Sequence, residues 1–326
     1  MKPLLEIRDV SLSYHTSAGE TPALSHLTFD LMPGEFLAVV GPSGCGKSTL
    51  LNLICGLLSA EEGTILMNDT VPSPGDPRIG YMLQKDHLLE WRTIYQNVTL
   101  GLEIRRELTP AKLKYIEEML CTYGLDKFRN ARPSQLSGGM RQRAALIRTL
   151  ALKPELLLLD EPFANIDDAS ARMIAGKLKE LNRTKGIGIL AVDHRLENWL
   201  GIADKVRVME NGVLRPEIMD VNTLDGALLK ELGVIVPGEA YETKLPEAQS
   251  GDVVLRLEHL ALRHGNNHIF TDINAEFRSG CIYAIVGESG CGKSSLFGAL
   301  SGLYSYQGQA LLEGRELRKL RKQDLG

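Results

Sequence analysis

A glycine-rich stretch near the N-terminus ends in a lysine that is followed by hydroxyl residues. It fits the pattern GxxxxGK[ST], and its residues are Gly41, Pro42, Ser43, Gly44, Cys45, Gly46, Lys47, Ser48 and the adjoining Thr49. Glycines let successive backbone N–H groups turn inward around phosphate oxygens, and a helix that follows adds its positive end. Lys47 can then reach the outer phosphates, and the Ser48 hydroxyl can bind Mg²⁺. A chance glycine-rich turn is the alternative, but it matches at fewer than roughly one position in ten thousand.

Two acidic residues, Asp160 and Glu161, directly follow the apolar run Leu156–Leu159. A buried strand that ends in two acids presents them at the edge of a sheet, beside the bound phosphates. Asp160 is then placed to hold Mg²⁺ through water, and Glu161 to orient or polarise the attacking water. Acids often end strands, so the pattern alone is weak evidence. Downstream of a phosphate-binding loop it predicts hydrolysis.

A third motif narrows the family, because phosphate-binding loops serve kinases, GTPases and motors alike. The sequence LSGG at Leu136–Gly139 is followed by RQR at Arg141–Arg143, shortly before the acid pair. With these motifs the chain resembles the ATP-binding subunits of ATP-binding cassette (ABC) transporters. The resemblance implies ATP and Mg²⁺ as ligands, and a helix end that points at the γ-phosphate held by a partner cassette, formed by Ser137, Gly138 and Gly139. Ser137 as an ordinary cap of a helix starting near Met140 is the alternative, and both can hold together.

The resemblance assigns roles to four further residues. Tyr14 matches the aromatic that stacks on adenine, although a tyrosine on a strand face is the plainer interpretation. Gln84 matches the Q-loop residue that senses Mg²⁺ and the transmembrane partner, and Asp167 matches a loop that crosses the dimer interface. His194 matches the switch histidine that contacts the γ-phosphate, whereas a lone histidine is usually structural. We therefore predict Glu161, His194 and Gln84 as catalytic residues, and Ser48, Gln84 and Asp160 as metal ligands.

Some residues depart from the family pattern. Asp193 stands where a threonine is usual before the switch histidine, and it places a negative charge beside His194; Met140 replaces a frequent glutamine. The segment Asp76–Ile104 is similar to the ATPases of nitrate, sulfonate and taurine importers. The sequence from Ala164 onward looks more like energy-coupling-factor or cobalt-type ATPases. None of these departures removes a group needed for the chemistry.

The chain starts the same pattern twice. The stretch Pro33–Leu57 recurs as Ser279–Leu303, and Leu5–Tyr14 recurs as Leu255–His264. The second copy carries a full phosphate-binding loop, made of Gly287, Glu288, Ser289, Gly290, Cys291, Gly292, Lys293, Ser294 and Ser295. No second LSGG, acid pair or switch histidine follows it. We therefore expect a complete cassette over residues 1–235, a Pro- and Gly-rich linker over 236–250, and the N-terminal part of a second cassette over 251–326.

The pattern of apolar runs predicts an α/β fold. Antiparallel strands fit Leu4–Tyr14 and Leu24–Leu31, and a buried strand Phe36–Val40 leads into the loop and a helix from Lys47 to about Leu58. The region Thr109–Leu152 reads as mostly helical with a break at the paired glycines. Strands at Leu156–Leu159 and Gly188–Val192, separated by a helix near Ala169–Thr184, imply a largely parallel sheet with ligands at its C-terminal edge. The expected fold is a P-loop NTPase cassette with a RecA-like sheet core, an antiparallel β subdomain and a helical subdomain, followed by a partial second cassette. In the partial second cassette, the apolar strand Cys281–Val286 would lack some of its neighbouring strands.

Composition sets limits on partners. The net charge of −4 gives no sign of a nucleic-acid surface, and apolar residues make up 44% of the chain. No apolar run approaches the roughly 18 residues of a membrane span. The five cysteines form no CxxC pair, which is typical of reduced thiols in the cytosol.

The function expected from the resemblance is a peripheral ATPase on the cytoplasmic face of the membrane that drives an importer. Its partners would be transmembrane permease subunits, a second ABC cassette and, for an importer, a substrate-binding protein. A soluble ABC ATPase acting on ribosomes is the alternative, but its cassettes would be joined by a long charged helix. A DNA-repair ATPase would need a long coiled coil between the loop and LSGG, and none is present. The cluster Leu88, Leu89, Trp91 and Ile94 is predicted to dock a membrane subunit, or else to pack inside the helical subdomain.

Overall fold

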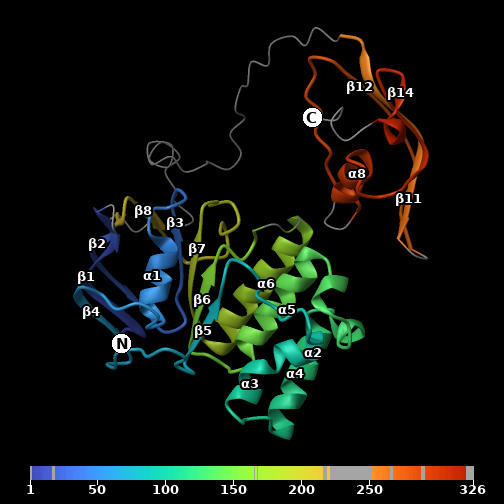
Figure 1. Ribbon diagram of the computed structural model, residues 1–326. Helices are drawn as coiled ribbons and strands as arrows, with labels where there is room; N and C mark the ends of the chain where they lie inside the picture. The colour runs from blue at the N-terminus through green and yellow to red at the C-terminus, as the bar shows by residue number, and fades with distance from the viewer. Residues whose placement is uncertain are drawn as a thin grey trace. The chain divides into compact units, whose positions relative to one another are not determined.

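The computed structural model describes residues 2–16, 19–164, 166, 168–215, 219–220, 251–264, 267–287 and 291–320. The chain divides into two compact units, within Met1–Glu239 and Ala240–Gly326, and each is described by itself (Figure 1). The linker predicted over 236–250 lies outside the described residues. Among the helices described, none is long and apolar enough to cross a membrane.

A mostly parallel sheet forms the centre of the first unit. Strands β3, β5, β6, β7 and β8 run parallel, whereas β9 and β10 pair with β8 in the antiparallel sense. Along the sheet the order is β10 (Met219–Asp220), β8 (Lys205–Glu210), β3 (Phe36–Val40), β7 (Gly188–Asp193), β6 (Leu156–Asp160) and β5 (Ile79–Met82), with β9 (Val213–Leu214) on β8. The predicted parallel α/β sheet is therefore confirmed.

Continuous apolar runs form the central strands because both faces of the sheet are covered. Every residue of β3, β6 and β7 is buried. Side chains alternate between the faces, so Phe36, Ala38 and Val40 join one hydrophobic core while Leu37 and Val39 join the other. Burying such strands on both sides stabilises the unit by roughly 1.5–3 kcal/mol per large apolar side chain.

Different subdomains cover the two faces (Figure 1). One core contains side chains of α1 (Lys47–Ile54) and of the antiparallel sheet β2–β1–β4, with β1 Leu5–Thr16, β2 Gly19–Leu31 and β4 Glu62–Met67. The other core contains side chains of α5 (Gly138–Leu150) and α6 (Asp168–Lys185). It also holds the smaller helices α2 (Ile94–Val98), α3 (Leu100–Ile104) and α4 (Pro110–Thr122). Short 3₁₀ turns at Asp126–Phe128 and Pro133–Gln135 lead from α4 towards α5.

Two helix boundaries differ from the sequence-based expectation. Helix α1 ends at Ile54 rather than near Leu58, because Gly56 adopts a left-handed φ of +69° that stops the helix. The glycine pair at Gly138–Gly139 does not break a helix; it begins α5. The Ser137 side chain accepts a hydrogen bond from the backbone N–H of Met140 at 3.4 Å, as an N-cap does.

The second unit is a small sheet with one helix. Its strands follow the order β12 (Asn267–Arg278), β11 (Val253–His264), β13 (Gln307–Leu312) and β14 (Arg315–Glu316). Helix α8 (Lys293–Leu300) and the 3₁₀ turn Leu317–Lys319 pack against this sheet through a core that includes Leu257, Leu296 and Leu317. Strand β11 pairs with β12 and β13 in the antiparallel sense, as β1 does with β2 and β4.

The stretch Cys281–Val286 forms no strand, so the expected strand there is wrong. Its side chains are exposed, with Ile282 at 95% and Val286 at 87% of full exposure. Among the residues described, no strand pairs with this stretch, which agrees with the expected lack of neighbours and explains the difference. The corresponding stretch in the first unit, β3, is buried because β7 and β8 flank it.

Candidate functional site

The first phosphate-binding loop connects β3 to α1. Gly46 caps α1 with a φ of +105°, in the left-handed region that favours glycine. Gly41 is required for a different reason, because a Cβ there would lie 2.1 Å from the carbonyl oxygen of Met209. Lys47 is buried, and its Nζ donates hydrogen bonds of 2.8 Å to the carbonyl oxygens of Gly41 and Pro42. The ammonium group is therefore held inside the curve of the loop.

Ser48 and Asp160 stand next to each other beside this loop. The Asp160 carboxylate is buried at the end of β6, and the nearby Ser48 side chain favours its charged form. Burial raises the pKa of Asp160, and the Ser48 side chain and the charge of Lys47 only partly offset it. A hydroxyl and a carboxylate near each other form an oxygen donor set of the kind that Mg²⁺ prefers.

Glu161 contacts both of the other predicted catalytic residues, Gln84 and His194. Its carboxylate accepts a 2.8 Å hydrogen bond from Gln84 Nε2, and its Oε1 lies 3.5 Å from His194 Nδ1. Glu161 follows β6, His194 follows β7, and Gln84 lies two residues after β5. These are adjacent parallel strands, so their C-terminal ends bring the three side chains together.

The backbone at Glu161 is strained. Its φ of +44° lies in the left-handed region, which costs a non-glycine residue roughly 1–2 kcal/mol. The backbone N–H of Glu161 donates to the carbonyl oxygen of Val192 at 2.9 Å, and this bond extends the pairing of β6 with β7. The strain turns the chain sharply just after β6, where its side chain meets Gln84 and His194.

Asp193 holds the loop that carries His194. Its buried carboxylate accepts hydrogen bonds from the backbone N–H groups of His194 at 2.7 Å and Arg195 at 3.0 Å. It also accepts from Trp199 Nε1 at 3.1 Å and from Asn198 Nδ2 at 3.4 Å. The residue that departs from the family pattern is thus the anchor of the turn after β7. Sequence analysis noted its charge but missed this role, because the partners lie in a turn with no sequence signature.

Trp199 connects that anchor to the core behind Glu161. The indole is fully buried, and its ring lies 4.8 Å from the Phe163 ring and 5.7 Å from the Phe36 ring between centroids. Phe163 follows Glu161 by two residues, and Phe36 begins β3. Aromatic packing of this kind stabilises a core beyond simple burial. The turn after β7 and the turn after β6 therefore share one rigid support.

The remaining predicted binding residues lie around this centre. Tyr14 is 43% exposed, and its hydroxyl lies 3.2 Å from Thr49 Oγ1 in the first turn of α1. Among the residues described, no hydrogen bond or ion pair joins Ser137, Gly138 or Gly139 to the first loop. Asp167 lies outside the described residues. The assigned roles stay predictions, and the positions agree with a site that uses Tyr14 directly and LSGG towards a partner.

At its described residues, the second phosphate-binding loop has the same local geometry as the first. Gly292 caps α8 with a φ of +98°, and Lys293 Nζ donates to the Gly287 carbonyl oxygen at 2.7 Å. Cys291 Sγ lies 3.8 Å from the same Nζ, and Ser294 and Ser295 are in the first turn of α8. Three predicted members, Glu288, Ser289 and Gly290, lie outside the described residues.

The predicted docking cluster separates into two groups. Leu88 and Ile94 are buried in the core with α2 and α5, so their assignment to a docking groove is wrong. Their burial is what the alternative interpretation predicted. Leu89 is half-buried, whereas Trp91 is 70% exposed. Asn97 is fully buried and bonds the backbone of the preceding turn, with its Oδ1 accepting from Leu89 N at 2.7 Å.

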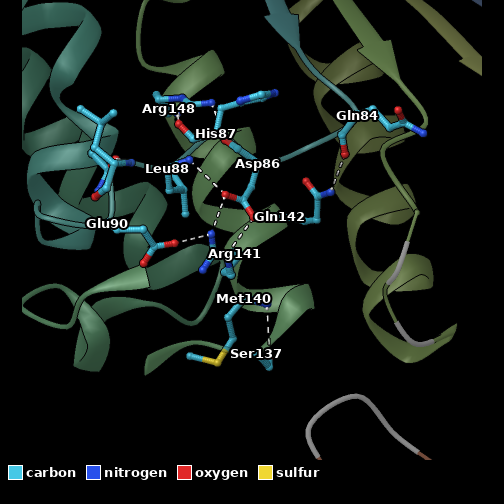
Figure 2. A network of polar contacts seen from close by, with 12 residues as sticks. Gln84, Asp86, His87, Leu88, Glu90, Ser137, Met140, Arg141, Gln142 and Arg148 are labelled. Carbon is cyan, nitrogen blue, oxygen red and sulfur yellow. Dashed lines mark hydrogen bonds and ion pairs between the residues drawn. The ribbon is translucent and has the colours of Figure 1, made fainter. Parts of the chain in front are cut away.

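A network of charged groups between Gln84 and α5 was missed by sequence analysis. It joins Asp86 and Glu90 to Arg141, and the backbone of Asp86 to Arg148 (Figure 2). An acid two residues after Gln84 and an arginine directly after LSGGM were the available signals. Acidic residues and arginines are common in any sequence, so neither residue could be singled out without the structure.

Comparison with known proteins agrees with this geometry. The family profile described as ABC transporter matches residues 24–164 and 270–326. The nitrate transport protein NasD of Klebsiella oxytoca is 36% identical over 228 residues, which cover 68% of this chain and 87% of that protein. The putative HMP/thiamine import ATP-binding protein YkoD of Bacillus subtilis is 28% identical and aligns with 99% of this chain and 66% of its own length.

A solved structure shows the same architecture. It is the dimeric post-hydrolysis state of the ATP-binding cassette MJ0796 bound to ADP and Pi. It matches with a TM-score of 0.61 and 27% sequence identity, covering 67% of this chain and 98% of that chain.

The hydrogen bonds of Asp193 generate the first prediction. Asp193→Ala removes the acceptor of four N–H groups, among them the buried Trp199 indole, and we expect the unfolding free energy of the first unit to fall by about 3 kcal/mol. Urea unfolding followed by tryptophan fluorescence measures this unit alone, because both tryptophans, Trp91 and Trp199, belong to it. Asp204→Ala is the matched control, since Asp204 accepts a single backbone bond from Phe36 and should lose about 1 kcal/mol. Equal losses in the two variants would contradict an anchoring role.

Proposed function

Because this chain belongs to the ABC transporter family and is an ABC-type ATPase, we propose that it drives the import of a solute through partner transmembrane subunits. The observation that supports it most is the carboxylate of Glu161 held between Gln84 Nε2 and His194 Nδ1. This trio stands at the same sheet edge as the loop that holds Lys47. A carboxylate, an amide and an imidazole at that edge can position a water molecule and respond to the terminal phosphate.

ATP binding uses the first loop and Tyr14. The Tyr14 ring, beside Thr49, stacks on adenine, and the backbone N–H groups of the loop donate hydrogen bonds to the phosphate oxygens. Lys47 Nζ exchanges its two carbonyl partners for phosphate oxygens, which carry a full charge and bind the ammonium more strongly. The loop therefore holds the Lys47 ammonium group in position before the nucleotide binds.

Mg²⁺ fits the residues beside the loop. Ser48 and Asp160 are near each other and offer only oxygen atoms, and Gln84 adds an amide oxygen near the same edge. A bound Mg²⁺ neutralises phosphate charge that the protein alone leaves uncompensated. The burial of Asp160 strengthens its attraction for a cation, because little water competes for its charge.

Hydrolysis follows from the placement of Glu161. Its carboxylate orients a water molecule and takes a proton from it as the water oxygen bonds to the γ-phosphorus. The bond from that phosphorus to the bridging oxygen breaks, and ADP leaves with the electron pair. Gln84 and His194, on either side of Glu161, donate hydrogen bonds to the water and to the terminal phosphate. Strain at Glu161 keeps the carboxylate at the position that this geometry needs.

Closure of two cassettes completes each site. The N-terminus of α5, capped by Ser137, faces the γ-phosphate held by a partner cassette, which explains why it makes no bond to its own loop. The partner is a second copy of this chain or a related cassette. Closure moves permease subunits at the cytoplasmic face of the membrane, and hydrolysis resets them.

The import direction rests on the relatives, which include a nitrate transport protein and a putative HMP/thiamine import ATP-binding protein. A substrate-binding protein would complete such an importer. The ribosome-bound alternative gains no support from these relatives, and the net charge of −4 gives no sign of a nucleic-acid partner. Trp91 supplies the exposed anchor for a permease, on a turn that the buried Asn97 fixes from below.

The catalytic assignment predicts that Glu161→Gln retains ATP binding but loses at least about 99% of turnover, because the amide cannot take the proton. Phosphate release measures turnover, and equilibrium binding of a fluorescent ATP analogue measures affinity. The trapped nucleotide should also convert the variant to a dimer on size-exclusion chromatography. Near-normal turnover would remove Glu161 from the role.

The two loops are expected to be unequal. Lys47→Ala removes the charge facing the phosphates beside the acid pair, so ATPase activity should fall to background. Lys293→Ala changes the same residue type in a loop that no acid pair follows in this sequence, and it should leave most activity. It serves as the matched control, measured on the full chain under the same conditions. Loss of activity in Lys293→Ala with retention in Lys47→Ala would place the active site in the second unit.

Trp91→Ala is expected to weaken association with permease-containing membranes about tenfold while leaving ATP affinity unchanged, because a buried interface tryptophan contributes more than 1 kcal/mol. Co-sedimentation with membrane vesicles that carry the co-purified permease measures the association. Val71→Ala, at a similarly exposed apolar residue outside the cluster around Trp91, is the control. A Trp91→Ala protein that unfolds would show a structural role for the ring.

A further inference from the structure

The segment Gln84–Glu90 is fastened to α5 by paired charges, and we infer that Asp86 and Arg141 are positioning residues that make Gln84 and the N-terminus of α5 move as one body. Gln84 contacts the catalytic carboxylate, and the α5 N-terminus is the part that meets the partner's nucleotide under the proposed function. The inference therefore rests on that function, and it assigns the link between the two to this ion pair.

The ion pair has a geometry that fixes orientation. Arg141 Nε lies 2.8 Å from Asp86 Oδ2, and Arg141 Nη2 lies 3.1 Å from Asp86 Oδ1 (Figure 2). The same Nη2 donates to Glu90 Oε1 at 2.8 Å. Two parallel bonds between planar groups prevent the rotation that a single bond would allow. Arg141 therefore fixes both the position and the tilt of the Asp86 side chain.

Further bonds join the same two segments. Arg148, two turns along α5, donates to the carbonyl oxygens of Asp86 and His87, both at 2.7 Å. Gln142 Nε2 donates to the backbone carbonyl oxygen of Gln84 at 3.3 Å. One helix thus holds the segment at its start and middle through neighbouring turns. A segment held at several points cannot slide along the helix without breaking all of them.

The pair is partly shielded from water. The side chains of Asp86 and Arg141 are 20% and 25% exposed. Burial opposes the charged form of Asp86, yet the hydrogen bonds from Arg141 and from the backbone N–H of Leu88 hold its pKa below the usual value. The carboxylate is therefore charged at neutral pH. Breaking a shielded pair leaves a charge without a partner, which costs more than the loss of a surface pair.

The link runs from the reacting carboxylate to the helix end in few steps. Glu161 bonds to the Gln84 side chain, and the Gln84 backbone bonds to Gln142 on α5. Arg141 adjoins Gln142 and lies one helical turn after Ser137, the cap of α5. A shift of Gln84 at the catalytic site is thereby passed to the helix end without a flexible element between them. Bonded groups thus connect Glu161 to the N-terminus of α5, which is more than closeness in space.

A staple that only stabilises the fold is the competing explanation, and the experiment separates the two. The variants are Asp86→Asn, Arg141→Gln and the double variant, in the full chain. The control is Glu117→Gln, which breaks another two-bond pair, Glu117–Arg129, in the helical subdomain away from Gln84. We measure affinity for a fluorescent ATP analogue, kcat, the melting temperature, and ATP-driven dimerisation in a Glu161→Gln background.

Each single variant should lower kcat about tenfold and abolish dimerisation at ATP concentrations that dimerise Glu161→Gln, with ATP affinity changed less than twofold. The double variant should be no worse than Arg141→Gln, because both single variants remove the Asp86–Arg141 pair and Arg141→Gln also removes the bond to Glu90. Glu117→Gln should match the parent protein in kcat and dimerisation. If a variant fails to fold, Arg141→Lys, which keeps the charge but loses the paired bonds, takes its place and should show the same loss of kcat.

Three outcomes would overturn the inference: unchanged kcat in the single variants, additive losses in the double variant, or equal losses in Glu117→Gln. Losses of ATP affinity as large as those of kcat would equally favour the structural staple. Failure of Glu161→Gln itself to dimerise with ATP is a different result. It would contradict the proposed cassette dimer, while the kcat comparison would still decide the role of Asp86 and Arg141.

Discussion

The parallel register of β5, β6 and β7 is the constraint on which the site depends. Leu159 pairs with Met82 on one side and with Ala191 on the other, so the three strands end within a residue or two of one another. Parallel strands place all their carboxyl ends at one edge, and each turn that follows begins from the same level. A slip of one residue in β6 would send Glu161 to the opposite face, away from Gln84 and His194. The chemistry is therefore determined by hydrogen bonding within the sheet.

The sheet holds its strands in register because both of its faces are covered, and the polar groups at its edge depend on that burial. Asp160 and Asp193 are buried carboxylates, and Glu161 has a strained backbone. Each would destabilise an isolated turn. Asp193 is compensated by four N–H donors, and the turn after β6 is supported by aromatic packing on Trp199. Stability from the two cores thus maintains a costly arrangement at one edge, as is common at active sites.

The sequence was sufficient to predict the parallel sheet, the strand β3 to the residue, and the loop with its lysine. Those features follow from local rules: apolar runs, glycine spacing and the strand–loop–helix order. The end of α1 was misjudged because apolar side chains continue past Gly56, and periodicity does not register a left-handed residue. Leu88 and Ile94 were misassigned because an apolar cluster has the same composition whether it faces a partner or a core. The Asp86–Arg141 contact joins residues far apart in the sequence, and no local pattern reveals such a pair.

Comparing the two phosphate-binding loops shows which features come from the loop sequence itself and which require the surrounding unit. In both, the glycine before the lysine has a left-handed φ, +105° and +98°, and the lysine bonds to the first glycine's carbonyl oxygen. This agreement arises although β3 is a fully buried strand and Cys281–Val286 is exposed and unpaired. At the residues described in both loops, the shared conformation therefore follows from the glycines and the lysine rather than from a flanking strand. The burial of Lys47, its neighbouring acids and the convergence on Glu161 all require the flanking strands. A phosphate cradle is thus a local structure, whereas an ATPase site is a property of the sheet.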